Sequence, residues 1–159
     1  MPAARRERAG AADGGVATPL TWDEFRKVDV RVGRVLAVTK MNPHTRGRDG
    51  RAAYRRQLAA HPSTYLGAFQ GPRLIGCVFG THDSRKAWIN RLAVHPGFRR
   101  QGIASRLVRE CERRLRRQGM DMFAALIDAD NRASASLFRS MGYDVTKLYY
   151  ARKKRRPGV

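Results

Sequence analysis

Two different periods of hydrophobic residues along this chain predict a mixed α/β fold. Between 101 and 118, apolar residues recur every three or four positions, which places them on one face of a helix. Weaker helical patterns cover 49–60 and 131–141. Shorter apolar runs with the length and composition of strands occupy 65–69, 74–81, 88–94, 122–127 and 143–151.

A further strand is predicted near the N-terminus, because Val28, Val30 and Val32 alternate with polar residues. The order of elements is then β-α-β-β-β-α-β-α-β, which predicts a sheet of mixed direction. Short turns join the three strands between 65 and 94, so we expect these strands to form an antiparallel meander.

The net charge is the unusual feature of the composition. The 33 lysines and arginines outnumber the 13 acidic residues and give a formal charge of +20. Such an excess favours polyanionic neighbours such as RNA, DNA or ribosomes, and an arginine-rich solvated surface accounts for it equally well. The two cysteines have no metal-site or disulfide spacing, so no metal is expected. No membrane span or signal peptide is visible, which predicts a cytoplasmic protein.

The most informative stretch runs from Trp88 to Arg106. It reads as a strand, a turn at His95-Pro96-Gly97, and the first turns of a helix. Gly102 and Ala104 leave the backbone bare where that helix begins. A bare helix start presents several N–H groups and the positive end of the helix dipole, which suit a phosphate or pyrophosphate group.

This stretch, with the spacing Arg-x-x-Gly-x-Ala from Arg99, resembles the acyl-CoA-binding motif of the GNAT N-acetyltransferases, Gln/Arg-x-x-Gly-x-Gly/Ala. The segment from Asn131 to Tyr143 resembles the second signature of that family, Asn-x-x-Ala-x-x-Leu-Tyr-x-x-x-Gly-Phe. The resemblance covers 63–152 and implies a GNAT-like (acyl-CoA N-acyltransferase) three-layer α/β fold, with a mixed central sheet flanked by helices. Its N-terminal part is abbreviated, because there is room for only one good helix between the first two strands.

By this resemblance, acetyl-CoA is the cosubstrate. The strand before the turn bonds the pantetheine arm, the N–H groups from 100 to 105 hold the pyrophosphate, and the asparagine that caps the later helix also bonds pantetheine. The cofactor-binding residues that the resemblance implies are Leu92, Ala93, Val94, Arg99, Arg100, Gln101, Gly102, Ile103, Ala104, Ser105 and Asn131.

The catalytic residues remain open at this stage. The tyrosine that usually protonates the departing thiolate in this family is replaced by Phe138, for which we expect core packing. Tyr143, Tyr149, Tyr150 or a water are candidates for the missing acid, and spacing alone does not choose among them. The candidate bases near the central strands are His82, Asp83, His95 and Asp128, each of which is more simply explained as part of a surface turn. The central strands offer no plausible general base, so we expect the amine to lose its proton to water and the enzyme to act mainly by positioning.

The leading hypothesis is an acyltransferase that moves an acetyl group from acetyl-CoA to a primary amine, by direct attack in a ternary complex. The acceptor, a protein or a small molecule, is not identified, and homodimer formation and weak nucleic-acid or ribosome association are left open. Two alternatives are an RNA- or tRNA-binding basic protein and a non-catalytic acyl-CoA sensor. The sensor is suggested by Phe138 and the missing base, and the RNA-binding protein by the net charge.

The domain boundaries follow from the same patterns. We expect a flexible leader at 1–19, a single acetyltransferase domain over 20–152, and a basic tail at 153–159. The stretch 20–38 is similar to the start of the tRNA-binding domains of CsaA-type chaperones. Because nothing after it continues that match, 20–39 is treated as an atypical part of the domain and the RNA-binding function is not carried over.

Overall fold

The computed structural model describes residues 28–32, 51–151 and 153. The predicted leader, the loop before the first long helix and almost all of the basic tail lie outside the described residues. Of the CsaA-like stretch, only 28–32 is described, and it forms the expected strand.

A five-stranded sheet forms the centre of the fold, with its strands in chain order from one edge to the other. Its strands are β1 (Asp29–Val32), β2 (Tyr65–Gln70), β3 (Arg73–His82), β4 (Ala87–Val94) and β5 (Phe123–Ala124). Strands β2, β3 and β4 form the antiparallel meander that the short turns predicted. Strand β1 is antiparallel to β2, and β5 is parallel to β4. The sheet is therefore mixed, as predicted, and β1 lies at one edge.

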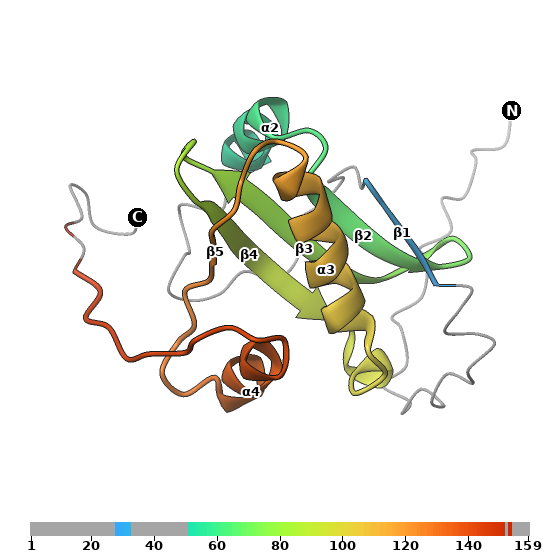
Figure 1. Ribbon diagram of the computed structural model, residues 1–159. Coiled ribbons are helices and arrows are strands. Elements are labelled where there is room, and N and C mark those ends of the chain that lie inside the picture. The colour runs from blue at the N-terminus through green and yellow to red at the C-terminus, as the bar shows by residue number, and fades with distance from the viewer. Residues whose placement is uncertain (1–27, 33–50, 152, 154–159) are drawn as a thin grey trace, which may run out of the picture.

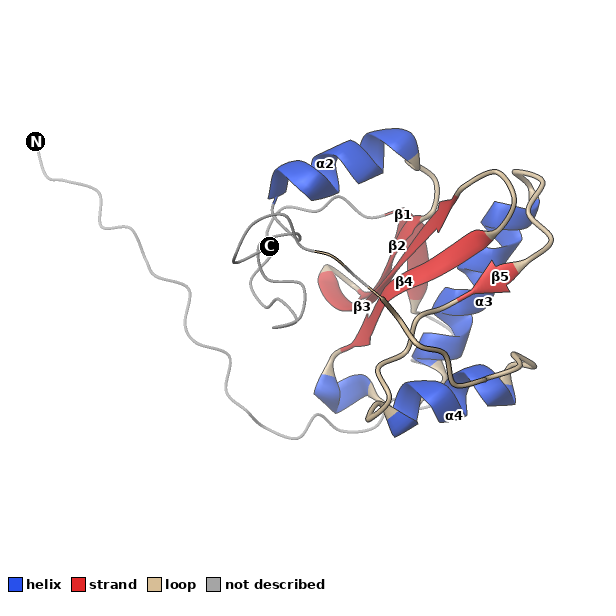
Figure 2. Cartoon of the chain, turned by 90° about the vertical axis from the view of Figure 1, so that its left-hand side faces the viewer, coloured by secondary structure: helices blue, strands red, loops and turns tan. Residues whose placement is uncertain are grey.

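Helices cover both faces of this sheet and give the fold three layers (Figures 1 and 2). Helix α2 (Arg51–Ala60) lies on one face and α3 (Ile103–Arg116) on the other, while α4 (Arg132–Ser140) lies at one end of the sheet. The connection from β4 to the parallel strand β5 passes through α3, as such a crossover requires. The three helices were each predicted from the sequence, with bounds that differ by a few residues.

Two glycines on one face of β3 allow α3 to approach the sheet closely. A Cβ atom at Gly80 would lie 2.5 Å from the Cys111 sulfur, and one at Gly76 would lie 3.1 Å from a methyl group of Leu107. The apolar stripe of α3 is fully buried against this face. The helix that carries the candidate phosphate site is thus held firmly on the centre of the sheet.

The C-terminal part differs from the sequence prediction. The predicted strand at 143–151 is wrong, because the structure has no strand there, and Leu148 and Tyr149 are largely exposed. The predicted strand at 122–127 is reduced to the two residues of β5. Both apolar runs have strand-like composition, but a strand also needs a paired neighbour, and composition does not supply one.

Candidate functional site

A β-bulge in the middle of β4 is the first element of the candidate site. Cys77 pairs with Ala93 but Phe79 pairs with Asn90, so β4 has one extra residue at this point. Arg91 takes up the extra length with a φ of 51°, a left-handed conformation that residues with a side chain rarely adopt. The Arg91 Nε donates to the Tyr54 hydroxyl of α2 at 3.3 Å, which ties the bulge to the helix on that face.

The second element is a gap in the strand pairing between β4 and the chain that follows β5. The two strands pair only at Ala87 with Phe123 and at Trp88 with Ala124. After β5 the chain runs on toward α4 (Figure 1). From Ile89 to Val94 the outer edge of β4 therefore has no strand partner in the described part of the chain, and this edge is about 20 Å long. Its amide and carbonyl groups can bind an extended ligand as a strand would.

The third element is the loop from His95 to Gln101, which folds into a compact turn. Phe98 anchors it in the core, being only 4% exposed. The Arg99 Nε donates to the carbonyl of Val94, the last residue of β4, at 3.2 Å. The Gln101 side-chain amide donates to the Gly97 carbonyl within the loop at 3.3 Å. The loop is fixed at both ends and sets where α3 begins.

The start of α3 has the geometry of an anion site. Arg100 and Gly102 both have left-handed φ angles, 62° and 76°, and the helix begins directly after Gly102. A left-handed residue beside right-handed ones turns successive N–H groups to one side, and such turns form anion-binding concavities. The first helical bond is donated by Arg106 to Gly102, and Gly102 supplies no capping side chain. The N–H groups at 103–105 have no acceptor within the helix, and the helix dipole adds positive potential.

Asn131 begins α4, as the sequence predicted. Its side-chain oxygen accepts a hydrogen bond from the Ser134 N–H at 3.1 Å, which is the usual contact of an N-cap asparagine. The side-chain NH₂ group has no partner among the described residues, and Asn131 is exposed. The cap therefore leaves this donor available to a ligand.

Phe138 and Tyr143 form an aromatic pair behind the site. Phe138 is 3% exposed and belongs to the core, as expected from its position in the sequence. Its ring meets the Tyr143 ring edge to face, with centroids 4.8 Å apart. The Tyr143 hydroxyl donates to the carboxylate of Glu112 on α3 at 2.6 Å. Burial, followed by this bond to a carboxylate, raises the pKa of Tyr143 above its usual value.

The candidate base His82 lies at the far end of β3. It pairs with Ala87 at the start of β4, whereas the loop before α3 follows the end of β4, about 23 Å along the strand. The His82 Nδ1 accepts from the Ser84 N–H, and its ring lies 5.0 Å from that of His61. The described fold therefore keeps His82 away from the α3 start.

Glu112 and Arg91 are two notable residues of this region that the sequence interpretation missed. Glu112 is only 8% exposed and also accepts from Arg116 at 3.2 Å. Its position, four residues after Val108 and three before Leu115, places an acid on the apolar stripe of α3, and that spacing is a signal that could have been read. The bulge at Arg91 carries no comparable signal.

Among the described residues, no group of three or more potential metal ligands lies together. No helix of the described part combines the length and hydropathy needed to cross a membrane. What the geometry offers is a bare strand edge beside an uncapped helix start, an arrangement suited to a ligand with an extended arm and a phosphate group.

Comparisons of the sequence match this chain to known acetyltransferases. The model of the acetyltransferase (GNAT) family matches residues 33–143. A curated acetyltransferase of Sodalis glossinidius is 28% identical over 90 residues, which are 57% of this chain and 63% of that protein. The chain thus spans less than two thirds of the length of this relative.

Solved structures share the fold. Ard1 from Thermoplasma volcanium superposes with a TM-score of 0.63 at 17% identity, over 76% of this chain and 85% of that one. AAC(6′)-Iy, solved with the bisubstrate analogue CoA-S-monomethyl-acetylneamine, superposes with a TM-score of 0.60 at 17% identity, over 81% and 99% of the two chains. Since the family model covers more than half of the sequence, this chain belongs to the acetyltransferase (GNAT) family.

Proposed function

We propose that the protein is an N-acetyltransferase that uses acetyl-CoA to acetylate a primary amine. The observation that carries the proposal is the position of the uncapped start of α3 at the end of the open edge of β4. Family membership and the relative AAC(6′)-Iy, solved with a CoA-containing analogue, support acetyl-CoA as the cosubstrate.

The residues at this place fit acetyl-CoA. The N–H groups of 102–105 would hold the diphosphate, and Gly102, with its φ of 76°, leaves them uncovered by a side chain. The backbone of Leu92, Ala93 and Val94 would bond the pantetheine arm, with the Asn131 side-chain amide as a further donor. Arg99 and Arg100 add positive charge beside the diphosphate.

When bound, acetyl-CoA supplies an acyl group activated as a thioester. In the transfer, the amine nitrogen forms a bond to the carbonyl carbon and the carbon–sulfur bond breaks. The amine gives up one proton to water, and the thiolate leaves or takes a proton from solvent. Because a thiolate is a tolerable leaving group near neutral pH, its departure does not require a protein acid. The protein's part is to align the two reactants in the gap beside β4.

The acceptor is expected to reach the gap from the side of α2. Ile89 and Val94 on β4 point into the core beneath α3, which closes that face. On the other face, Arg91 and Ala93 are exposed. The guanidinium of Arg91 there, and the net charge of the chain, favour an amine that also carries a carboxylate or phosphate over a polyamine.

An amine panel tests the proposal directly. Release of free CoA thiol is followed with acetyl-CoA and three groups of amines: amino acids and other carboxylate-bearing amines, polyamines, and N-terminal peptides. We expect thiol release above the rate of hydrolysis, fastest with an anionic amine. Tight binding of acetyl-CoA without release for any amine would instead indicate the non-catalytic sensor.

Two glycines give a matched pair of variants. Gly102→Val places a branched side chain over the helix start, whereas Gly119→Val imposes the same left-handed strain, at a φ of 83°, in open space beyond the other end of α3. Both should lower stability by ~1–2 kcal/mol. Only Gly102→Val should weaken acetyl-CoA binding in calorimetry. Equal affinities in the two variants would contradict the assigned site.

A further inference from the structure

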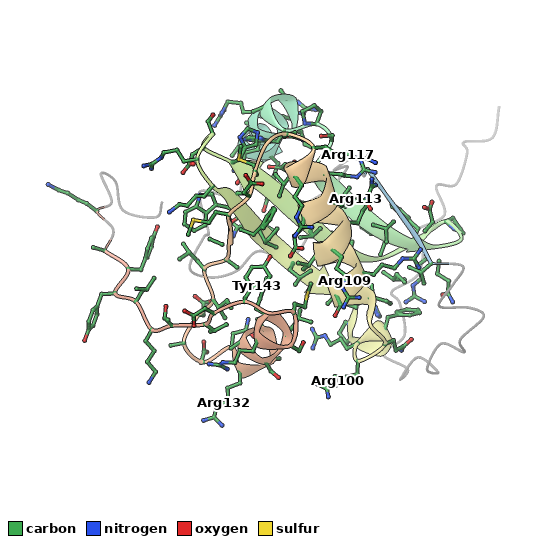
Figure 3. All side chains as sticks on the ribbon, in the orientation of Figure 1. Arg100, Arg109, Arg113, Arg117, Arg132 and Tyr143 are labelled. Carbon is green, nitrogen blue, oxygen red and sulfur yellow. The ribbon has the colours of Figure 1, made fainter. Side chains whose placement is uncertain are left out.

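The exposed flank of α3 has far more positive charge than the fold needs. From Arg106 to Arg117 the chain has six arginines and two glutamates. Arg109, Arg113 and Arg117 follow one another at intervals of four residues, so they lie along one line of the helix surface, as Figure 3 shows. This line is ~12 Å long at the usual rise of a helix.

Part of this charge has a structural role. Arg114 donates to the Ser63 carbonyl at 3.0 Å and to Glu110 at 2.7 Å, and Arg113 also donates to Glu110. These two guanidinium groups, Arg113 first, lower the pKa of Glu110 to about 2, so that carboxylate is charged at neutral pH. Arg113 and Arg114 also lie in the last turn of α3, where positive charge interacts favourably with the helix dipole.

Arg109 and Arg117 have no such role. Their side chains have no hydrogen-bond or ion-pair partner among the described residues, and both are exposed. Like charges four residues apart destabilise a helix by roughly 0.2–0.5 kcal/mol per pair. At Arg109, helix stability therefore favours a neutral residue, whereas Arg117, at the C-cap, gains from the helix dipole. Neither guanidinium takes part in a contact within the described fold, so both are available to a ligand.

An open groove runs along the same flank of α3, between it and the edge strand β1. Its volume is about 780 Å³, and its lining is Val30, Gly102, Ser105, Arg106, Arg109, Glu110, Arg113 and Arg114. Sites for small molecules are mostly apolar and enclose their ligand. This groove is open and lined mainly by charged residues, so it suits a long polyanion that lies across the surface.

We propose that this arginine groove, between α3 and β1, binds the sugar-phosphate backbone of a nucleic acid. Over the ~12 Å from Arg109 to Arg117, a duplex presents about seven phosphates, so consecutive arginines can each meet a phosphate. Guanidinium groups bind phosphate oxygens in a bidentate manner. The net charge of +20 draws any nucleic acid toward the protein, and the groove gives it a place to bind.

An acidic protein fits the groove less well. Stable protein interfaces depend on buried apolar or aromatic anchors at their centre. In the described part of the chain, Val30 is the one apolar side chain in the lining besides the alkyl stems of the arginines. A surface of this kind gains affinity mainly by releasing counterions, which is how nucleic-acid backbones are bound.

A matched pair of double variants tests the groove. Arg109→Gln with Arg117→Gln removes one charge that lines the groove and one that continues the same line of α3 beyond it. Arg55→Gln with Arg56→Gln removes two exposed charges from α2 on the other face. Fluorescence anisotropy would measure binding to labelled single-stranded RNA, duplex RNA and duplex DNA, each longer than about 16 nucleotides. Salt titrations would give the number of phosphates engaged, and the KM for acetyl-CoA would be measured in parallel.

We expect the groove variant to bind the preferred nucleic acid about tenfold more weakly near 0.1 M salt, with a salt slope smaller by about 1.8 for a duplex. The α2 variant should change the nucleic-acid affinity and the salt slope by much less. The KM for acetyl-CoA should be the same in the groove variant and the α2 variant. Equal losses in the two variants would overturn the proposal in favour of net charge alone. A raised KM for acetyl-CoA with unchanged nucleic-acid binding would assign the groove to the cosubstrate, and no binding by the unaltered protein would also refute the proposal. The nucleic-acid binding results do not depend on whether the amine panel succeeds, and if the panel fails, the calorimetric affinity for acetyl-CoA replaces the KM.

Discussion

Replacing Tyr143 by phenylalanine separates a structural role from a catalytic one. The substitution keeps the ring that packs on Phe138 and removes only the hydroxyl that donates to Glu112 at 2.6 Å. Glu112 is 8% exposed, so water reaches its carboxylate poorly, and Arg116 at 3.2 Å remains as its partner. We therefore expect Tyr143→Phe to destabilise the fold rather than to abolish catalysis.

The size of the loss follows from the contact. A hydrogen bond to a charged, largely buried group contributes ~1.5–3 kcal/mol to stability. For a chain of this size, a loss of about 2 kcal/mol lowers the melting temperature by ~4–8 °C. Acetyl transfer, measured as thiol release well below the melting temperature, should change by less than about threefold, because the raised pKa of Tyr143 makes it a poor proton donor at neutral pH.

The loss of stability at alkaline pH gives a second test of the same contact. The pKa of Tyr143 is higher in the folded state than its usual value near 10, so the unfolded chain loses this proton first as the pH rises. The stabilising contribution is therefore complete below pH ~10 and is lost above it. In denaturant unfolding, the Tyr143→Phe variant should therefore lose less unfolding free energy above pH ~10 than the unaltered protein does. A fall in kcat of a hundredfold or more, with stability unchanged, would refute the structural role and make Tyr143 the acid.

Three further predictions concern single side chains. Gly80→Ala places a methyl group 2.5 Å from the Cys111 sulfur, so it should cost ~1–3 kcal/mol in denaturant unfolding, and adding Cys111→Ala should restore part of the loss. Asn131→Ser keeps a good helix cap but removes the amide donor, so we expect unchanged stability and a raised KM for acetyl-CoA. Burial, and then the charge of His82, lowers the pKa of His61 in the folded state. The unfolding free energy should therefore fall as the pH drops below ~6.5, and His61→Gln should remove this pH dependence between pH 7.5 and 5.

Strong local patterns in the sequence predicted most of the fold. Helix α3 was expected over 101–118 and is present at Ile103–Arg116, because its apolar stripe is regular and Gly119 follows it. The meander of β2, β3 and β4 was predicted for a similar reason, since short turns leave few alternatives to antiparallel pairing.

Features that depend on distant partners were not predictable from local patterns. The contact between Tyr143 and Glu112 joins residues 31 positions apart, and the bulge at Arg91 depends on how β4 meets β3. The strand expected at 143–151 has suitable composition but no paired strand in the described structure. The motif around Gly102 located the start of α3, and the left-handed φ of Gly102 gave the reason for a glycine there.

The most direct test of the account is a crystal structure of the protein with acetyl-CoA bound. The account predicts that the diphosphate oxygens accept hydrogen bonds from the backbone N–H groups of 102–105 and that the pantetheine arm lies along Leu92–Val94 in the gap beside β4. A diphosphate bound elsewhere, for example along Arg109 and Arg113 with the start of α3 left empty, would contradict it.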